Sequence, residues 1–254
     1  MDADTYLHSV LSKITAPTGV SGPGNIIRAG LLPYVSQWAG RQLVSLDVSG
    51  SYAKGTAILG GTDVDLFASL RPETSQTLKE IYDSLASYLG GQGFSVRRQN
   101  VSINVTYQSK SVDITPGRLR NAYSTDHSIW VSRQNTWQQT NVGRHIQSIG
   151  GSAHTDVIRL MKRWRKLHSL EFPSFAVELA VLRGLQQTSR YSGLASRFNL
   201  VLEFLRDRIG TAQLIDPANS NNDVADELTT AEKTSIATQA RQSRNATYWE
   251  QVVW

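Results

Sequence analysis

Four residues near the start of this 254-residue chain are suited to phosphate chemistry. Gly50 and Ser51 form a small-residue turn that can approach a phosphate closely, and Asp63 and Asp65 follow it. Residues two apart in a strand point to the same face, so these two carboxylates would lie side by side. Because like charges repel, a site that brings two carboxylates together usually holds a cation, and oxygen-only ligands suit Mg²⁺.

A third carboxylate, Asp113, lies between Val112 and Ile114 in a strand that we expect Pro116 and Gly117 to end. Alternation along that strand would turn Asp113 away from the core. Three carboxylates on neighbouring strands can hold two Mg²⁺ ions about 3.5–4 Å apart, with Mn²⁺ as the alternative. One ion would hold a triphosphate. The other would lower the pKa of an attacking hydroxyl, and Asp113 would accept its proton.

The segments Gly50–Ile58 and Asp63–Phe67 resemble the DNA polymerase β-like nucleotidyltransferase superfamily, whose pattern is Gly-Ser, Asp-x-Asp and a third Asp on a later strand. The complete residue sequences of the two segments are similar to one branch of this superfamily. That branch contains oligoadenylate synthase, cyclic GMP-AMP synthase and the bacterial cGAS/DncV-like nucleotidyltransferases (CD-NTases). Archaeal-type CCA-adding enzymes share the first motif. The resemblance implies an α+β fold, in which a mixed-sheet polymerase β-like core is followed by a C-terminal helical lobe.

The C-terminal half favours the synthase branch. Residues 154–168 have the period of an amphipathic helix with one basic side, for which a solvated face is the alternative interpretation. The resemblance implies that Lys162 and Ser174 contact the donor triphosphate and that Phe175 stacks on a base, although Phe175 could equally belong to the core. We expect Glu178, within an apolar helical run, to be a structural carboxylate with hydrogen-bond partners.

The coarse pattern that positions these residues is a mixed sheet followed by helices. We expect a helix at the N-terminus and a final helix from about Thr229. Glu232 would complete a capping box at the start of the final helix. From about Trp130 the pattern is mostly helical, and the loop 215–222 would close the helical lobe. We therefore expect a nucleotidyltransferase core over residues 1–125 and a helical lobe over 126–254. The expected strands cover 44–48, 64–69, 95–107 and 112–115, and a helix covers 75–88.

Composition excludes several classes of protein. The chain has no cysteine, which rules out disulfides and cysteine-ligated zinc. Its 26 Lys and Arg against 21 Asp and Glu give a net charge of +5, which is compatible with nucleotides or weak nucleic-acid binding. We find no apolar run long enough for a membrane span and no secretion signal, so we expect a cytoplasmic protein without a membrane partner.

The resemblance implies an enzyme that joins nucleoside triphosphates, ATP among them, into a cyclic di- or trinucleotide. In this family such products are second messengers in antiphage defence (CBASS) and activate a separate effector. Linear oligonucleotides, transfer to an RNA 3′ end or a protein, and a non-catalytic nucleotide-binding module are the alternatives. The sequence leaves several properties open: the choice of base, the linkage, the oligomeric state and the need for an activating protein or nucleic acid.

Overall fold

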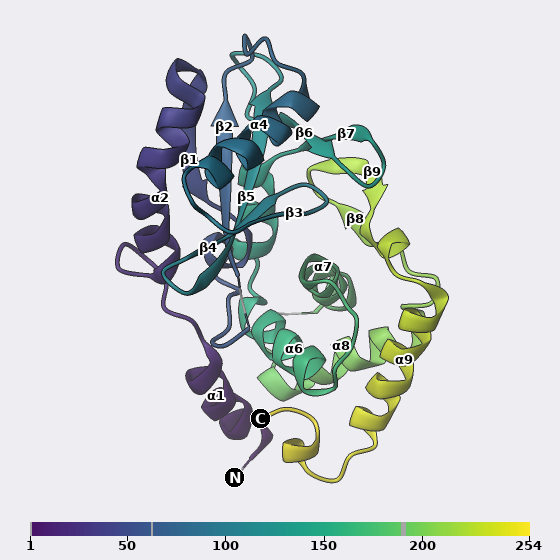
Figure 1. Cartoon of the computed structure of the whole chain (residues 1–254). Helices are drawn as coiled ribbons and strands as arrows, with labels where there is room; N and C mark the ends of the chain where they lie inside the picture. The colour runs from purple at the N-terminus through teal and green to yellow at the C-terminus, as the bar shows by residue number, and fades with distance from the viewer. Residues whose placement is uncertain (1, 62, 189–191) are drawn as a thin grey trace. The chain divides into compact units, whose positions relative to one another are not determined.

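A computed structural model describes residues 2–61, 63–188 and 192–254 (Figure 1). The chain divides into two compact units. The sheet unit comprises Pro17–Gly55 and Thr62–Ile146. The helical unit comprises Met1–Ala16, Thr56–Gly61 and Gln147–Trp254. The short connection between the Gly-Ser turn and Asp63 therefore belongs to the helical unit, although the residues on both sides of it belong to the sheet unit.

The described part of the sheet unit contains a seven-stranded mixed sheet. Its strands are β1 (Leu43–Val48), β2 (Val64–Leu70), β3 (Val96–Arg98), β4 (Ile103–Tyr107), β5 (Lys110–Leu119), β6 (His127–Val131) and β7 (Thr136–Thr140). The order is β1-β2-β5-β4-β3, and β6 pairs with both β5 and β7. The β2–β5 pair is parallel and the others are antiparallel. One parallel pair thus sets the two Asp-bearing strands next to each other in the middle of the sheet.

Helices α2 (Pro23–Ala39) and α4 (Leu78–Gly91) pack on this sheet through residues that recur at helical spacing. The unit also contains the short helices α3 (Gly50–Ala53) and α5 (Val142–His145) and a 3₁₀ turn at Gly40–Gln42. Helix α4 begins with a capping box, in which the side chains of Thr77 and Glu80 each accept a hydrogen bond from the other residue's backbone N–H. Its buried face, which includes Leu85 and Leu89, joins Leu66 and Ile114 of the sheet in one hydrophobic core.

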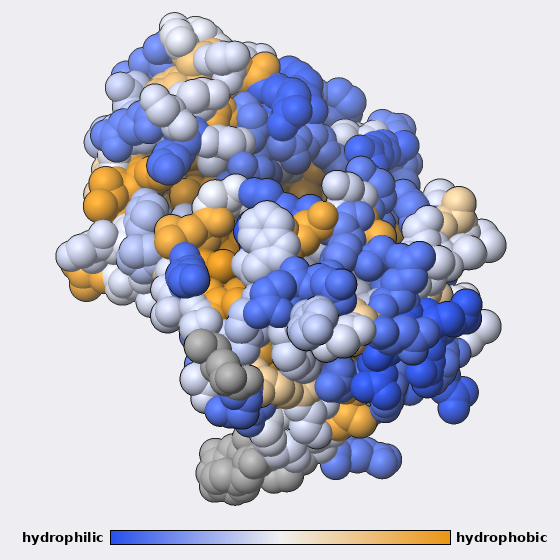
Figure 2. Space-filling view, turned by 90° about the horizontal axis from the view of Figure 1, so that it is seen from below, coloured by the Kyte–Doolittle hydropathy of each residue, from blue (hydrophilic) through white to orange (hydrophobic). Residues whose placement is uncertain are grey.

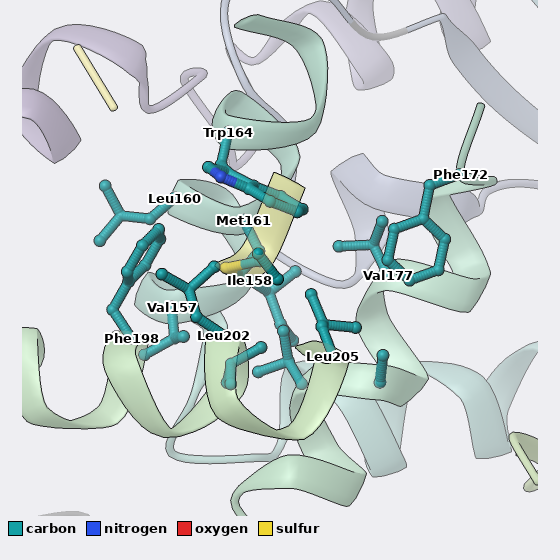
Figure 3. Packing of buried hydrophobic residues seen from close by; sticks show 14 of the residues in the cluster. Val157, Ile158, Leu160, Met161, Trp164, Phe172, Val177, Phe198, Leu202 and Leu205 are labelled. Carbon is teal, nitrogen blue, oxygen red and sulfur yellow. The ribbon is translucent and has the colours of Figure 1, made fainter. Parts of the chain in front are cut away.

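The helical unit has its own core. Its elements are α1 (Ala3–Ile14), a π-helical turn (Ile146–Gly150), α6 (Thr155–Leu167), α7 (Ser174–Gly184), α8 (Leu194–Arg208), the hairpin β8 (Ile215–Asp216) and β9 (Asn219–Asp223), a 3₁₀ turn (Val224–Glu227), α9 (Thr230–Arg244) and a last 3₁₀ turn (Trp249–Gln251). Trp164 and Met161 of α6 pack against Phe198 and Leu202 of α8 (Figure 3). Each fully buried side chain of this size contributes about 1.5–3 kcal/mol, so this cluster is a main source of the unit's stability.

The structure corrects two predictions about strands. Residues 95–107 form two strands rather than one, because the chain turns where the Gln99 N–H donates to the Ser102 carbonyl (2.9 Å). Strand β5 does not end at Pro116 and Gly117. Pro116 lies where the neighbour of β5 changes from β4 to β6, so its missing N–H is tolerated there.

The division into units also differs from the predicted boundary between residues 125 and 126. Residues 127–140 form the β6–β7 hairpin, which extends the sheet, instead of starting a helical lobe. Helix α1 is part of the helical unit, where it packs on α6 and α8. The predicted N-terminal helix and the final helix, with its Thr229–Glu232 capping box, are confirmed.

No helix in the described ranges combines the length and the apolar character needed to cross a bilayer. On the face that Figure 2 shows, small hydrophobic patches are interspersed among larger hydrophilic areas.

Candidate active site

The paired strands place two of the predicted carboxylates opposite each other. In the parallel β2–β5 pair, Asp65 is the register partner of Asp113. Val64 and Ile114, which point to the other face, are buried in the core, as predicted. Asp63 lies exposed just before β2, and its negative charge contributes to raising the pKa of Asp113, so the two carboxylates are electrostatically coupled. These neighbouring central strands thus gather negative charge that a cation would stabilise.

The Gly-Ser turn is packed directly on this carboxylate group. Gly50 has a positive φ of 56°, and the neighbouring Ser49 N–H donates to the Asp65 carbonyl (2.8 Å). A Cβ on Gly50 would clash with the Asp65 side chain. Glycine is therefore required here for two reasons, the close approach of Asp65 and the positive φ.

Ser51 is 7 % exposed, and its hydroxyl has no hydrogen-bond partner within the described residues. Leaving a buried hydroxyl unsatisfied costs about 1–3 kcal/mol. Such an orphan group beside paired carboxylates is what a phosphate-binding turn would show before its ligand binds.

Asp113 is held by two amides that the sequence analysis did not identify. Asn104 Nδ2 donates to Asp113 Oδ1 (2.7 Å), and Gln99 Nε2 donates to the same oxygen (2.9 Å). Burial is the largest effect on the pKa of Asp113 and raises it. The hydrogen bond from Asn104 lowers this pKa, the negative charge of Asp63 raises it, and the positive charge of Arg97 lowers it. A raised pKa favours a carboxylate that accepts a proton. Alternation in β4 could have revealed Asn104, whereas Gln99 lies in a turn without a periodic signal.

Lys162 is buried in a hydrogen-bonded ion pair. Its ammonium lies 2.6 Å from Glu178 Oε1, 3.0 Å from the Thr56 hydroxyl and 3.3 Å from the Thr56 carbonyl. An ammonium has three donors, and here it donates to oxygens of Glu178 and Thr56. Glu178 is 0 % exposed and also accepts from the Thr56 hydroxyl (2.6 Å), which confirms it as a structural carboxylate. The triphosphate contact of Lys162 stays a prediction, and in this arrangement the side chain fixes the segment that leads to Asp63.

Ser174 and Phe175 begin helix α7. The Ser174 hydroxyl accepts a hydrogen bond from Arg165 Nη1 (3.0 Å), which also donates to the Phe172 carbonyl (2.6 Å). Burial lowers the pKa of the Arg165 guanidinium. Phe175 packs partly buried against the core of the helical unit, and its stacking role stays a prediction. No pattern in the sequence distinguishes Arg165 from the other basic residues of α6.

The predicted site residues thus fall into two sets. Gly50, Ser51 and the three aspartates lie in the sheet unit, and Lys162, Ser174 and Phe175 lie in the helical unit. Over the described ranges, no three Asp, Glu or His side chains form a complete metal centre by themselves. The carboxylate donors nevertheless suit Mg²⁺, which usually binds through one or two carboxylates and completes its shell with water and substrate phosphates.

Comparison with known proteins identifies the class. No family model matches the chain. It is 26% identical to cyclic AMP-AMP-AMP synthase of Escherichia coli strain MS 115-1, over 86% of this chain and 85% of that protein.

Solved structures share its fold. CdnC of Escherichia coli MS115-1 with ATP has a TM-score of 0.75 at 21% identity, covering 96% of this chain and 91% of that one. The same protein in a complex with HORMA-deltaN has a TM-score of 0.74 at 22% identity, covering 96% and 90%. The CdnE cyclic dinucleotide synthase of Elizabethkingia meningoseptica has a TM-score of 0.71 at 12% identity, covering all of both chains.

The mixed sheet matches the fold of these relatives, and the comparisons identify a nucleotidyltransferase. Within that class, the chain is similar to members of the CD-NTase family, which are cyclic oligonucleotide synthases.

Proposed function

We propose that this protein joins nucleoside triphosphates, with ATP among them, into a cyclic di- or trinucleotide that acts as a second messenger in antiphage defence. The Asp65–Asp113 register pair, with Asp63 beside it and the orphan Ser51 hydroxyl on the adjoining turn, supports this most strongly. The name of its relative, cyclic AMP-AMP-AMP synthase, favours an adenine-containing product.

The proposed reaction is the transfer of a nucleotidyl group to a ribose hydroxyl. The hydroxyl oxygen of one nucleotide forms a bond to the α-phosphorus of another, the bond from that phosphorus to the β-phosphate's bridging oxygen breaks, and pyrophosphate leaves. Asp113 accepts the hydroxyl proton, since a carboxylate held in place by hydrogen bonds can act as a general base. Repeating the transfer and closing the last linkage onto the first nucleotide yields the ring.

The proposed metal ligands are Asp63, Asp65 and Asp113. A pair of Mg²⁺ ions, when bound, supplies the positive charge that neutralises the phosphates and acidifies the hydroxyl. The chain's own groups position the substrate, with Gly50 and Ser51 at the phosphates. In the helical unit, Lys162 and Ser174 are the proposed triphosphate contacts and Phe175 the proposed stacking platform, because an aromatic ring stacks on any base.

The proposed partners are a separate effector that recognises the cyclic product and an activator of the enzyme. The relative CdnC forms a complex with a HORMA protein, which favours a protein activator over a nucleic acid for this chain.

Product analysis tests the proposal. The purified protein is incubated with the four nucleoside triphosphates and Mg²⁺ or Mn²⁺, and its products are analysed by mass spectrometry before and after phosphatase treatment. A phosphatase-resistant product with the mass of a cyclic oligonucleotide, absent from Asp63→Ala/Asp65→Ala, is expected. Products with removable terminal phosphates would mean linear oligomers. Label on added RNA or on protein, without small products, would overturn the proposal.

A further inference from the structure

The Asp113 carboxylate is hydrogen bonded asymmetrically. Asn104 Nδ2 and Gln99 Nε2 both donate to Oδ1, at 2.7 and 2.9 Å. Among the residues that the structure describes, none donates a hydrogen bond to Oδ2. Two amide donors on one oxygen fix the rotation of the carboxyl group, while the other oxygen keeps its lone pairs for a ligand.

Both amides are themselves held in place. Asn104 is 9 % exposed, is the cross-strand partner of Asp113, and its Nδ2 also contacts the Ser111 hydroxyl (2.8 Å). The backbone of Gln99 is anchored from two sides, because its carbonyl accepts from the Tyr82 hydroxyl (2.6 Å) and from the Ser132 hydroxyl (2.9 Å). These anchors come from α4 and from the residue after β6, so the Gln99 turn is tied to two separate elements.

The hydrogen bonds that stabilise the Gln99 turn are made by its backbone and do not involve its side chain. The Gln99 carbonyl and N–H make the hydrogen bonds that hold the turn, whereas its side-chain amide bonds Asp113. The fold therefore does not need that amide to close the turn. The contact places a neutral donor where it orients a carboxylate without adding a competing charge.

We propose that Gln99 and Asn104 are positioning residues for the reaction: they orient Asp113 so that Oδ2 is the oxygen offered to the metal. The inference rests on the proposed function. Groups that hydrogen bond a ligating carboxylate in this way typically contribute 10–100-fold to metal affinity or activity. A side chain that served only the fold would change stability and leave metal affinity unchanged.

Gln99→Leu tests this, because leucine removes the donor at similar size and leaves the backbone anchors in place. The matched control is Gln139→Leu. Gln139, in β7 of the same sheet, also donates its side-chain amide to a carboxylate, Asp126 Oδ2 (3.2 Å), in the loop just before β6. Asn104→Ala is the second variant, with its melting temperature measured alongside since Asn104 is buried.

The first readout is Mn²⁺ binding in the presence of a non-hydrolysable ATP analogue, measured by electron paramagnetic resonance. The second is kcat and KM for ATP across a Mg²⁺ titration. Gln99→Leu should weaken Mn²⁺ binding or lower kcat by about 10–100-fold with KM for ATP nearly unchanged, and Gln139→Leu should match the wild type in both.

The inference would be overturned if Gln99→Leu kept both its Mn²⁺ affinity and its kcat within about twofold of the wild type. It would also be overturned if the wild type bound no Mn²⁺. If the wild type binds Mn²⁺ and makes no nucleotide product, the proposed function fails, while weaker Mn²⁺ binding by Gln99→Leu still supports the positioning role. If the wild type makes the product and Gln99→Leu is indistinguishable from it, only the positioning role fails.

Discussion

Replacing Gly50 with alanine should disable the site through geometry alone. A Cβ built on Gly50 would lie 2.6 Å from the Asp65 Cβ and closer still to the Asp65 carboxylate, whereas real Cβ contacts essentially never fall below 3.0 Å. Either the Gly-Ser turn or the Asp65 side chain must therefore move, by about 1 Å. A misplacement of about 1 Å in a catalytic arrangement can cost about 100-fold in rate.

The substitution also has a backbone cost, since φ at Gly50 is 56°. An L-residue in this region costs about 1–2 kcal/mol, which affects stability and can be measured apart from the rate. Gly93 is a control in the same unit, because its φ is also positive (87°) and a Cβ there would meet nothing within 4 Å.

The assay compares Gly50→Ala, Gly93→Ala and the wild type by product formation from ATP and by urea unfolding. Both variants should lose a similar free energy of unfolding, about 1–2 kcal/mol, and Gly50→Ala alone should lose about 100-fold in kcat. Equal activity of the two variants would refute the reasoning that glycine is needed at Gly50 for the Asp65 carboxylate.

Three further predictions concern stability and its dependence on pH. Glu178→Ala leaves the buried Lys162 ammonium without its carboxylate and should cost about 3–5 kcal/mol in urea unfolding. The double variant Lys162→Met/Glu178→Leu should lose clearly less, and an equal loss would count against the ion pair. Because burial raises the pKa of Asp113, the folded state binds its proton more tightly than the unfolded state, and the wild type loses stability from this group as pH rises above the unfolded value of about 4. Asp113→Asn should therefore melt at a higher temperature than wild type at neutral pH, with the difference shrinking in acid; a constant difference across pH would contradict this. Thr229→Ala removes the capping hydrogen bonds of α9 and should cost about 1 kcal/mol, measured by thermal unfolding, and an unchanged melting temperature would exclude that contribution.

Local patterns in the sequence predicted much of this molecule. Alternation around Asp65 and Asp113 placed both on strands with their neighbours buried, and the Thr229–Glu232 pair marked the start of α9. These predictions succeed because strand faces and helix caps depend on residues a few positions apart.

The predictions fail where the local structure depends on residues that are distant in the sequence. The β6–β7 hairpin exists because Gly117 of β5 pairs with Ile129, a partner that residues 127–140 do not specify by themselves. Likewise, Ile58 is drawn into the helical unit by its bridge to Thr15. The burial of Lys162 depends on Glu178 and Thr56, which the spacing of basic residues within α6 cannot reveal.

The most direct test of the central claim is the stoichiometry of the reaction. Pyrophosphate release and nucleotide incorporation are measured together, with ATP and Mg²⁺, for the wild type and Asp63→Ala/Asp65→Ala. Closure of a ring releases one pyrophosphate for every nucleotide incorporated, whereas each linear chain keeps one triphosphate. A one-to-one ratio that depends on the two aspartates is predicted. A smaller ratio would contradict ring closure, and equal release by the double variant would contradict the assignment of the carboxylates.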